Sequence, residues 1–357
     1  MKKLLLASVA VTGLAFAAPA HADVDLEIGG YFKGYGAFVS QDESVNNDIA
    51  AFDMVRDTEL HLGGETTLDN GLTVGAHFEF DADGNDAMGV DESYVYFSGN
   101  WGRVNVGTEN GAGYLLQVAA PSADANVDGI AQYVSPFVTT GGLTAATLDY
   151  NMVPSAKNDK ITYLSPIMSG FQAGISYTPD SDAAADNTIS MTNTAAQQYE
   201  EGYEIGLRYE GEFENVGVVA GAGYAIVKED GTTTSATDDK EAWNIGLDLD
   251  VAAFGIGAIY MEDNNGEGTG AGTGDTETMV VGVDYTTGPF KLGVSYFNQE
   301  DKATTGVEYD RYTAGVVYEY GPGMSFRGSV QMLDQDNPTG TADADGTAVL
   351  LGTQINF

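Results

Sequence analysis

The sequence predicts an all-β protein: a transmembrane antiparallel β-barrel of 16 strands with an inward-folded third extracellular loop. Three observations lead to this fold class. Apolar and polar residues alternate with the period of a strand through most of the chain after residue 23. Short and long connections take turns between the alternating segments. No stretch beyond the N-terminal region approaches a run of about eighteen apolar residues, which excludes a helical membrane protein but not a barrel, whose strands are only about half apolar.

The first 22 residues have the form of a signal peptide. Lys2 and Lys3 precede the apolar run LLLASVAVTGLAFAA, and Ala20-His21-Ala22 matches the small-x-small rule for cleavage. The apolar run is short for a membrane-spanning helix, and polar sequence follows at once. We therefore expect an exported chain whose residues 23–357 form the outer-membrane barrel.

The composition is that of a folded, strongly acidic protein. The formal net charge of -39 becomes -41 for residues 23–357, because the predicted signal peptide removes two lysines. Such a charge argues against a nucleic-acid partner. The 43% hydrophobic content, with 20 Tyr and 15 Phe, is too high for a disordered chain. Because an exported chain without cysteine has no disulfides, a large sheet must supply its stability.

Sixteen segments show the alternation. In YEIGLRYEGE, for example, Tyr203, Ile205 and Leu207 share one face, whereas Glu204 and Arg208 share the other. The expected strands are centred on residues 24–39, 55–66, 72–82, 91–98, 102–108, 158–165, 171–179, 201–210, 214–228, 241–250, 254–262, 277–286, 290–299, 308–319, 324–334 and 347–357.

The connections between these segments differ in kind. Short ones carry turn residues, as in LDNG, GNWG, TTGP and YGPG, and long ones are polar and acidic, as in PDSDAAADNTISMTNTAAQQ. Their regular alternation gives each hairpin one tight end and one elaborate end, which is the layout of an outer-membrane barrel with periplasmic turns and extracellular loops. A soluble sandwich or a β-solenoid would alternate too, but its connections need not sort by length.

One connection is far longer than a hairpin needs. Residues 109–157 contain the apolar stretches GYLLQVAA and YVSPFV, which would be unfavourable in water. We expect this segment to fold inward and to pack on the barrel wall.

The C-terminal segment TAVLLGTQINF has the pattern of a strand. Val349, Leu351, Ile355 and Phe357 share one parity, which we expect to face lipid. A barrel has no free edge only if its last strand pairs with its first, so this segment must lie beside VDLEIGGYFKGYGAF.

Three stretches carry a resemblance to a known family. The stretches ESYVYFSGNWGRVNVG and NDKITYLSPIMSGFQAGISY, together with the terminal Phe357, resemble the Gram-negative general diffusion porins, in particular those of α-proteobacterial type, over essentially the whole chain. The chain departs from the family pattern at Thr108, where an arginine is frequent, and at Ile355, where an aromatic residue is frequent.

The resemblance implies a homotrimer in outer-membrane lipid and lipopolysaccharide, with a third loop that narrows the pore. It also implies that the terminal aromatic residue Phe357 is the signal read by the barrel-assembly machinery.

Cations concentrate on the polar parity, which faces the lumen if the apolar parity faces lipid. We expect these residues to line the pore on one wall: Lys33, Arg103, Arg208, Lys291, Arg311 and Arg327. Arg56 shares its parity with Leu60 and Leu62, and it joins the set only if a bulge or a position near the rim turns it inward. A charge on the lipid face costs about 2 to 4 kcal/mol, so stability alone explains the inward placement but not the number of cations.

Acidic residues on the long connection complete the expected constriction. Glu109, Asp124 and Asp128 would face the wall cations across water, and opposed charges would set up a transverse field that orients polar solutes. The sequence therefore predicts a passive water-filled channel for small hydrophilic solutes and ions. The acidic balance suggests a preference for cations, and the channel requires no cofactor.

Two other functions stay open. A substrate-selective channel for a sugar, phosphate or similar solute could use Tyr31, Tyr35 and Tyr114 as an aromatic ladder. An enzyme could use His61 and His77, which lie on adjacent strands with Glu59 and Glu79 on the same parity, as a metal site or general base. Polar wall residues are the commoner meaning of such a pair, and the chain has no cysteine and no distinctive serine motif for hydrolysis.

The acidic connections also suggest a divalent cation. Runs such as DADGND and EDNNGEG offer the carboxylate and carbonyl oxygens that Ca²⁺ and Mg²⁺ prefer, although neither contains the spaced ligands of an EF-hand. Their main expected effect is solubility of a surface exposed to water.

Overall fold

The computed structural model describes residues 24–43, 48–83, 89–140, 142–145, 147–181, 199–229, 238–266, 274–302, 306–338 and 341–357. The predicted signal peptide and parts of several long connections lie outside these residues.

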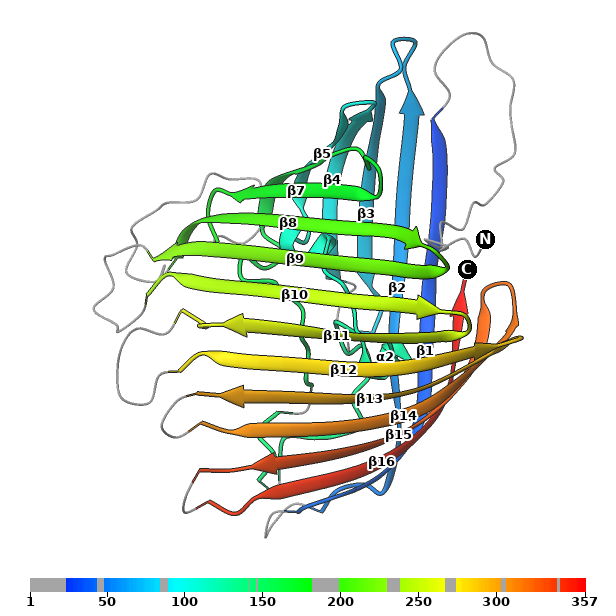
Figure 1. Ribbon diagram of the computed structural model, residues 1–357, viewed down its shortest axis with the longest axis vertical. Helices are drawn as coiled ribbons and strands as arrows, with labels where there is room; N and C mark the ends of the chain where they lie inside the picture. The colour runs from blue at the N-terminus through cyan, green and yellow to red at the C-terminus, as the bar shows by residue number, and fades with distance from the viewer. Residues whose placement is uncertain are drawn as a thin grey trace.

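Sixteen antiparallel strands form one closed barrel, as the sequence predicts (Figure 1). The strands are β1 (Asp25–Gln41), β2 (Phe52–Thr67), β3 (Thr73–Asp81), β4 (Gly89–Gly99), β5 (Gly102–Thr108), β6 (Asp159–Leu164), β7 (Phe171–Thr178), β8 (Tyr199–Phe213), β9 (Val216–Glu229), β10 (Lys240–Val251), β11 (Phe254–Asp263), β12 (Thr276–Thr287), β13 (Phe290–Asp301), β14 (Glu308–Gly321), β15 (Met324–Asp336) and β16 (Ala344–Asn356). Two single-turn helices, α1 (Ala112–Leu115) and α2 (Ala125–Asp128), lie between β5 and β6. Among the described residues, no helix has the length and apolar character needed to cross a bilayer.

The barrel closes where the last strand meets the first. Strand β16 pairs with β1 from Tyr31 opposite Asn356 to Gln41 opposite Gly346. The pairing continues past the strand end, because the Gly30 amide donates to the Phe357 carbonyl at 3.0 Å and the Phe357 amide donates to the Gly30 carbonyl at 3.1 Å. The predicted pairing of the two chain ends is confirmed, and Figure 1 shows β16 in red beside β1 in blue.

The alternation has the predicted sense. On β8, Ile205 and Leu207 are 45% and 52% exposed on the outside of the barrel, whereas Glu204 is buried on the inside. Apolar side chains are exposed in the same way around the wall, which is favourable in lipid and would be unfavourable in water.

Aromatic residues border this apolar band at two levels. Five strands each carry two outward aromatic residues six positions apart, which is roughly 20 Å along a strand. The pairs are Phe171 with Tyr177, Tyr203 with Tyr209, Phe254 with Tyr260, Phe290 with Tyr296 and Tyr312 with Tyr318. Neighbouring strands bring these rings into contact, as in Phe171 with Tyr209 at 4.6 Å and Tyr177 with Tyr203 at 5.3 Å between centroids. Such girdles mark the two membrane interfaces.

The connections sort to the two ends of the barrel. Tight turns join β2 to β3, β4 to β5 and each later pair of this kind, and both chain ends lie on the same side as these turns. The longest connection at the other end is the third, between β5 and β6, and we call its residues 109–157 the inner loop. The inner loop folds into the barrel, as predicted.

Glycine on the wall makes room for the inner loop. A Cβ atom on Gly282 would lie 1.8 Å from the Pro121 carbonyl oxygen, and one on Gly206 would lie 2.3 Å from the Ala112 carbonyl oxygen. Further glycines against the loop continue this seat from β7 to β14, namely Gly174, Gly221, Gly246, Gly257, Gly293 and Gly315. The absence of side chains lets the loop backbone run directly along the inner face of the sheet.

The inner loop also has an apolar core of its own. Val127, Val134, Phe137 and Tyr150 are buried and pack with wall residues such as Phe297, Leu333 and Leu350. Gln117 ties the two arms of the loop together, because its amide donates to the Tyr150 carbonyl at 2.6 Å and its oxygen accepts from the Met152 amide at 3.0 Å. The two apolar stretches therefore pack on the wall, as predicted, although Tyr133 and Val138 stay 44% and 46% exposed.

We predict that Gly282→Ala displaces the inner loop while the barrel still forms. The added methyl group meets backbone at Pro121, and we expect a cost of about 1 to 3 kcal/mol from overpacking. Limited chymotrypsin digestion, with fragments identified by mass spectrometry, should show new cleavage within residues 109–157. Gly321→Ala is the matched control, because a Cβ atom at Gly321 meets nothing within 4 Å. Equal protease resistance of the two variants would contradict this account of the seat.

Candidate functional site: the inner loop and the open wall

The inner loop covers one side of the lumen and leaves another open. It contacts glycines from β7 to β14, and Asp124 and Asn126 extend the contact to Arg327 on β15 and Gln354 on β16. Beside β1 to β3, a cavity of about 410 Å³ remains, lined by residues that include Glu27, Tyr31, His61, His77 and Gln354. The inward side chains of the first strands therefore border open space.

Two of the expected loop acids touch wall arginines directly. Arg311 Nη2 donates to Asp128 Oδ1 at 2.8 Å, with both side chains 1% exposed. Arg327 Nη1 donates to Asp124 Oδ1 at 2.6 Å, and Asp124 is fully buried. We predicted that these acids lie opposite wall arginines, and they do. The prediction that water separates the two charges is wrong for both pairs, because they are in direct contact. These charges fasten the loop to the wall instead of facing each other across an opening.

Further polar contacts make these buried pairs favourable. The Tyr35 hydroxyl donates to Asp124 Oδ2 at 2.8 Å, and Arg311 Nη1 also donates to Gln132 Oε1 at 3.0 Å. The Arg311 guanidinium lies over the Phe297 ring, 4.7 Å from its centroid. Such contacts offset part of the hydration that a buried ion pair loses, although Arg311 Nε is buried without a hydrogen-bond partner among the described residues.

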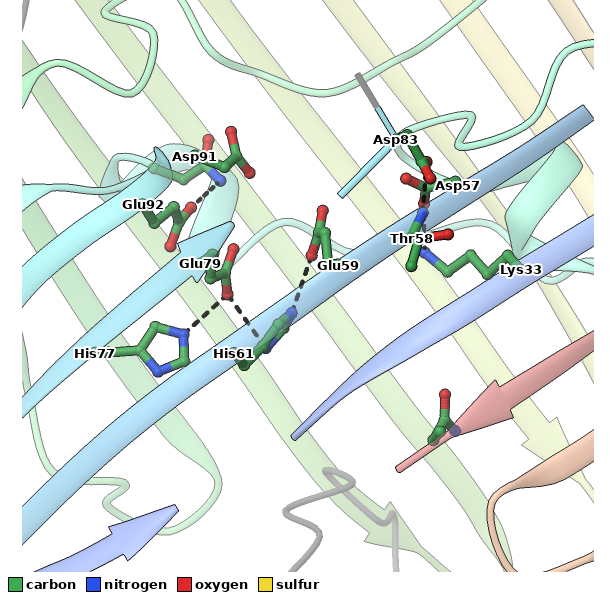
Figure 2. Close-up of polar contacts among 12 residues, drawn as sticks. Lys33, Asp57, Thr58, Glu59, His61, His77, Glu79, Asp83, Asp91 and Glu92 are labelled. Atoms are coloured by element: carbon green, nitrogen blue, oxygen red, sulfur yellow. Dashed lines mark hydrogen bonds and ion pairs between the residues drawn. The ribbon is translucent and has the colours of Figure 1, made fainter. Parts of the chain in front are cut away.

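Lys33 is enclosed by aromatic rings. Its ammonium lies 3.5 Å from the centroid of Tyr31 and 3.0 Å from that of Tyr133 on the inner loop. It also donates to Asp57 at 3.2 Å, and Figure 2 shows Lys33 beside this carboxylate. The cation therefore holds Tyr133 of the loop against β1 and neutralises the nearest carboxylate.

Arg103 and Glu109 are joined through an amide. Arg103 Nε donates to Asn105 Oδ1 at 2.6 Å, and Asn105 Nδ2 donates to the Glu109 carboxylate at 2.6 and 2.9 Å. Burial raises the pKa of Glu109, and the hydrogen bonds from Asn105 and the charges of Arg103 and Lys160 oppose that rise. The expected pairing of this acid with the basic wall is thus indirect.

Arg208 and Lys291 also lie on the inward parity. Arg208 Nη1 donates to the Gln117 carbonyl at 3.1 Å and its other terminal nitrogen lies 3.6 Å from Glu210, while Lys291 pairs with Asp284 at 3.0 Å. Lys291, with a 40% exposed side chain, is the more accessible of the two.

Arg56 differs from the expectation that it lines the pore. The register of β1 with β2 runs without a shift from Phe38 opposite Phe52 to Asp25 opposite Glu65, so the bulge that would turn Arg56 inward is absent from these two strands. Its half-exposed side chain pairs with Asp83 at 2.5 Å, next to the end of β3. Arg56 is an outward-facing residue near the rim.

A row of carboxylates lies on the inward face of neighbouring strands. We call Asp57 and Glu59 on β2, Glu79 on β3 and Glu92 on β4 the acid row; Figure 2 shows them along neighbouring strands. Asp57 pairs with Lys33, and Lys157 of the inner loop lies 3.5 Å from Glu92. Among the described residues, Glu59 and Glu79 contact histidines and form no ion pair with a lysine or arginine. The sequence did not identify these residues as pore acids, although strand alternation places them on the parity of the lumen.

Two further residues hold the base of the inner loop. Lys160 Nζ donates to the carbonyls of Glu109, Ala156 and Asn158 at 2.5, 2.8 and 2.8 Å. Glu204 on β8 accepts from Ser155 Oγ at 2.5 Å and from the Gly113 amide at 3.2 Å. The sequence analysis did not identify either residue. Their position on the inward-facing parity of β6 and β8 was the only sign of a role inside the barrel.

The recorded ring contacts of the described residues do not join Tyr31, Tyr35 and Tyr114 to one another. Tyr35 is fully buried beneath Asp124 and Asn126, so no solute reaches it. Tyr31 contacts His61 and Tyr133 at 5.9 and 6.2 Å between centroids.

The two histidines lie together within this open wall. His61 Nε2 lies 3.0 Å from a Glu59 carboxylate oxygen and its Nδ1 lies 3.7 Å from Glu79 Oε1. His77 Nε2 lies 2.9 Å from the same Glu79 oxygen. The acidic runs DADGND and EDNNGEG, by contrast, extend outside the described residues, and the calcium or magnesium site expected there stays a prediction.

A closed barrel with a loop folded into its lumen defines a channel-forming outer-membrane protein. A family model described as Gram-negative porin matches residues 7–338, and the chain belongs to this family. The fold and the family are those of a diffusion channel in the outer membrane.

Relatives and solved structures agree over nearly the full length. The uncharacterized protein RC0098 of Rickettsia conorii is 23% identical over 448 residues, with 100% of each chain covered. The anion-selective porin from Comamonas acidovorans has a TM-score of 0.66 at 17% identity, covering 94% of this chain and 100% of that chain. The trimer form of OmpT, an outer-membrane protein of Vibrio cholerae, has a TM-score of 0.63 at 15% identity, covering 94% and 99%.

We predict that Arg311→Leu releases the inner loop. The variant leaves Asp128 buried without its cation, which costs about 3 to 5 kcal/mol. Because the chain has no cysteine and Val127 is fully buried, Val127→Cys reports opening through its rate of maleimide labelling. In that background we expect Arg311→Leu to accelerate labelling at least about 100-fold, since each 1.4 kcal/mol is a factor of ten.

Lys291→Leu serves as the control for this experiment. Its pair with Asp284 is partly exposed and contributes at most about 1 kcal/mol, so labelling should change by less than about fivefold. Similar labelling rates in the Arg311 and Lys291 variants would refute the anchoring role of the buried pair.

Proposed function

We propose that this protein is a passive, water-filled channel for small hydrophilic solutes and ions that prefers cations. The observation that carries the preference is the acid row on the wall of the first strands, together with the neutralisation of Asp124 and Asp128 on the inner loop. Asp124 and Asp128 contact Arg327 and Arg311, so neither these carboxylates nor these guanidinium groups present an isolated charge to a passing ion.

The remaining charges favour a negative lumen. Glu59 and Glu79 lack a lysine or arginine partner in the described part of the chain, whereas Lys33 is covered by two rings and paired with Asp57. Unneutralised carboxylates in a narrow, partly dehydrated passage raise the local concentration of cations and lower that of anions.

The fold does not decide the sign of the selectivity. The structural neighbour from Comamonas acidovorans is named an anion-selective porin, and its likeness to this chain at 17% identity extends to the fold alone. The proposal therefore depends on this chain's own wall residues.

The proposed setting is a homotrimer in outer-membrane lipid and lipopolysaccharide, reached by export through the predicted signal peptide of residues 1–22. A trimer form is named for the neighbour from Vibrio cholerae, which supports this state for the same fold. Diffusion needs no reaction, no cofactor and no coupled energy, so the proposed channel is not an enzyme.

Planar-bilayer recordings in a KCl gradient test the proposal. We expect the reversal potential to show that K⁺ permeates better than Cl⁻. Combined Glu59→Gln and Glu79→Gln should lower the ratio of K⁺ to Cl⁻ permeability by at least about twofold, because two lumen charges are lost where screening is incomplete.

Combined Asp69→Asn and Glu214→Gln remove the same number of charges from exposed positions at tight turns. This control should keep the wild-type reversal potential. A wild-type preference for Cl⁻, or an equal effect of both pairs of substitutions, would exclude the acid row as the source of selectivity.

We also predict that the terminal aromatic ring acts in assembly beyond its contribution to the seam. Deleting Phe357 removes both its ring and its two backbone hydrogen bonds to Gly30, which contribute about 0.5 to 1.5 kcal/mol each. Phe357→Ala keeps the backbone pairing and removes the ring. If the barrel-assembly machinery reads the aromatic residue, both variants lower the yield of folded trimer in cells, measured by gel mobility without boiling. Wild-type yield from Phe357→Ala would disprove the role of the ring.

A further inference from the structure

We propose that His61, His77 and Glu79 form a binding site for a divalent transition-metal ion, with Zn²⁺ as the representative ion, in the wall of the lumen. This inference goes beyond the diffusion of solutes, because it assigns one class of ion to one set of side chains. It rests on the geometry of the three ligands, on their accessibility and on the charges around them.

The ligand atoms are close to the separations that a metal requires. One donor atom from each of the three residues lies within 4.8 Å of the others. Glu79 Oε1 is 2.9 Å from His77 Nε2 and 3.7 Å from His61 Nδ1. Tetrahedral ligands at about 2.1 Å from Zn²⁺ lie about 3.4 Å apart, so the two Glu79 separations need to change by about half an ångström or less, and the two histidine nitrogens already lie within 4.8 Å of each other.

The sheet register explains why these atoms converge. His61 lies directly opposite Glu79 in the pairing of β2 with β3, and His77 lies opposite Gly63. All three side chains therefore share the inward face, and the missing side chain at Gly63 leaves room for the His77 ring. Figure 2 shows both rings turned toward the Glu79 carboxylate.

Glu59 orients one ligand. It accepts a hydrogen bond from His61 Nε2 at 3.0 Å, which places the proton on that nitrogen and leaves the lone pair of Nδ1 directed at Glu79. A carboxylate that fixes the tautomer of a metal-binding histidine is a general feature of such sites. Glu59 is therefore a positioning residue and not a ligand.

The site is accessible and lies in a negative field. The side chains of His61, His77 and Glu79 are 30%, 26% and 18% exposed, and the two rings line the cavity of about 410 Å³. Glu59, Asp81 and Asp91 form a neighbouring acidic group, Lys157 contacts Asp91 and Glu92, and Lys33 is paired with Asp57. Carboxylates concentrate divalent cations, and two imidazoles select a first-row transition metal over Mg²⁺ or Ca²⁺.

Calorimetry on the folded, untagged, detergent-solubilised protein tests binding without reference to transport. The only other histidine in the chain is His21, in the predicted signal peptide, and no cysteine competes for the ion. We expect saturable Zn²⁺ binding with one ion per chain, and at least about tenfold weaker binding after combined His61→Gln and His77→Gln. A tenfold excess of Mg²⁺ should leave the wild-type Zn²⁺ affinity unchanged.

Combined Glu27→Gln and Glu65→Gln is the matched control. It removes two carboxylates from strands β1 and β2 on the same side of the lumen and leaves the three ligands intact. This variant should bind Zn²⁺ as the wild type does. No Zn²⁺ binding by the wild type, equal binding by the histidine variant, or displacement by Mg²⁺ would each overturn the proposal.

Two further comparisons separate orientation from charge and binding from transport. Glu59→Gln keeps an oxygen acceptor for His61 and Glu59→Ala does not, so Zn²⁺ should bind more tightly to the Gln variant, and equal affinities would remove the orienting role. In bilayers, micromolar Zn²⁺ should reduce K⁺ conductance of the wild type and not of the histidine variant. Because calorimetry is independent of conductance, a protein that binds Zn²⁺ without conducting would fail as a channel and still confirm the site.

Discussion

In the hydrocarbon of a membrane, no backbone N–H or C=O group can rely on water, and this constraint determines most of the structure. The sheet must close, so β16 pairs with β1 and Phe357 pairs with Gly30 at the seam. Closure then separates every strand into an outward apolar parity and an inward parity. The inward parity is free to carry glycine for the inner loop and charges for the lumen, because lipid never contacts it.

The inner loop has to meet the same requirement inside the barrel. Its backbone lies against glycine, and its carboxylates Asp124 and Asp128 are buried, so each needs a cation at contact distance. Arg311 and Arg327 supply those cations and are thereby withdrawn from the aqueous passage. The net charge that lines the aqueous passage is therefore determined by residues that the loop does not cover. On β2 to β4 these residues are largely carboxylates.

The alternation of the sequence was enough to predict the number of strands, their facing, the pairing of the two chain ends and the inward fold of residues 109–157. Parity also placed Arg311, Arg327 and Lys33 on the inner face. It could not separate a residue that faces water from one that faces the loop, because both share the same parity and differ only in what lies above them. For Arg56, strand parity alone predicted the correct, outward-facing position. The bulge assumed in order to turn it inward does not exist in the pairing of β1 with β2.

The same distinction explains why the acid row was missed. Charges of opposite sign on a loop and a wall suggest a transverse field, yet such charges attract each other most strongly when nothing separates them. Once the loop lies on the wall, direct contact between the opposite charges has the lower energy. The charges then form two short ion pairs and no longer produce a field across an opening. A field that acts on solutes must come from charges that no loop residue reaches. On this wall that leaves Glu59 and Glu79, whose partners are His61 and His77, so the groups that we propose to attract cations are also those that we propose to hold a metal ion.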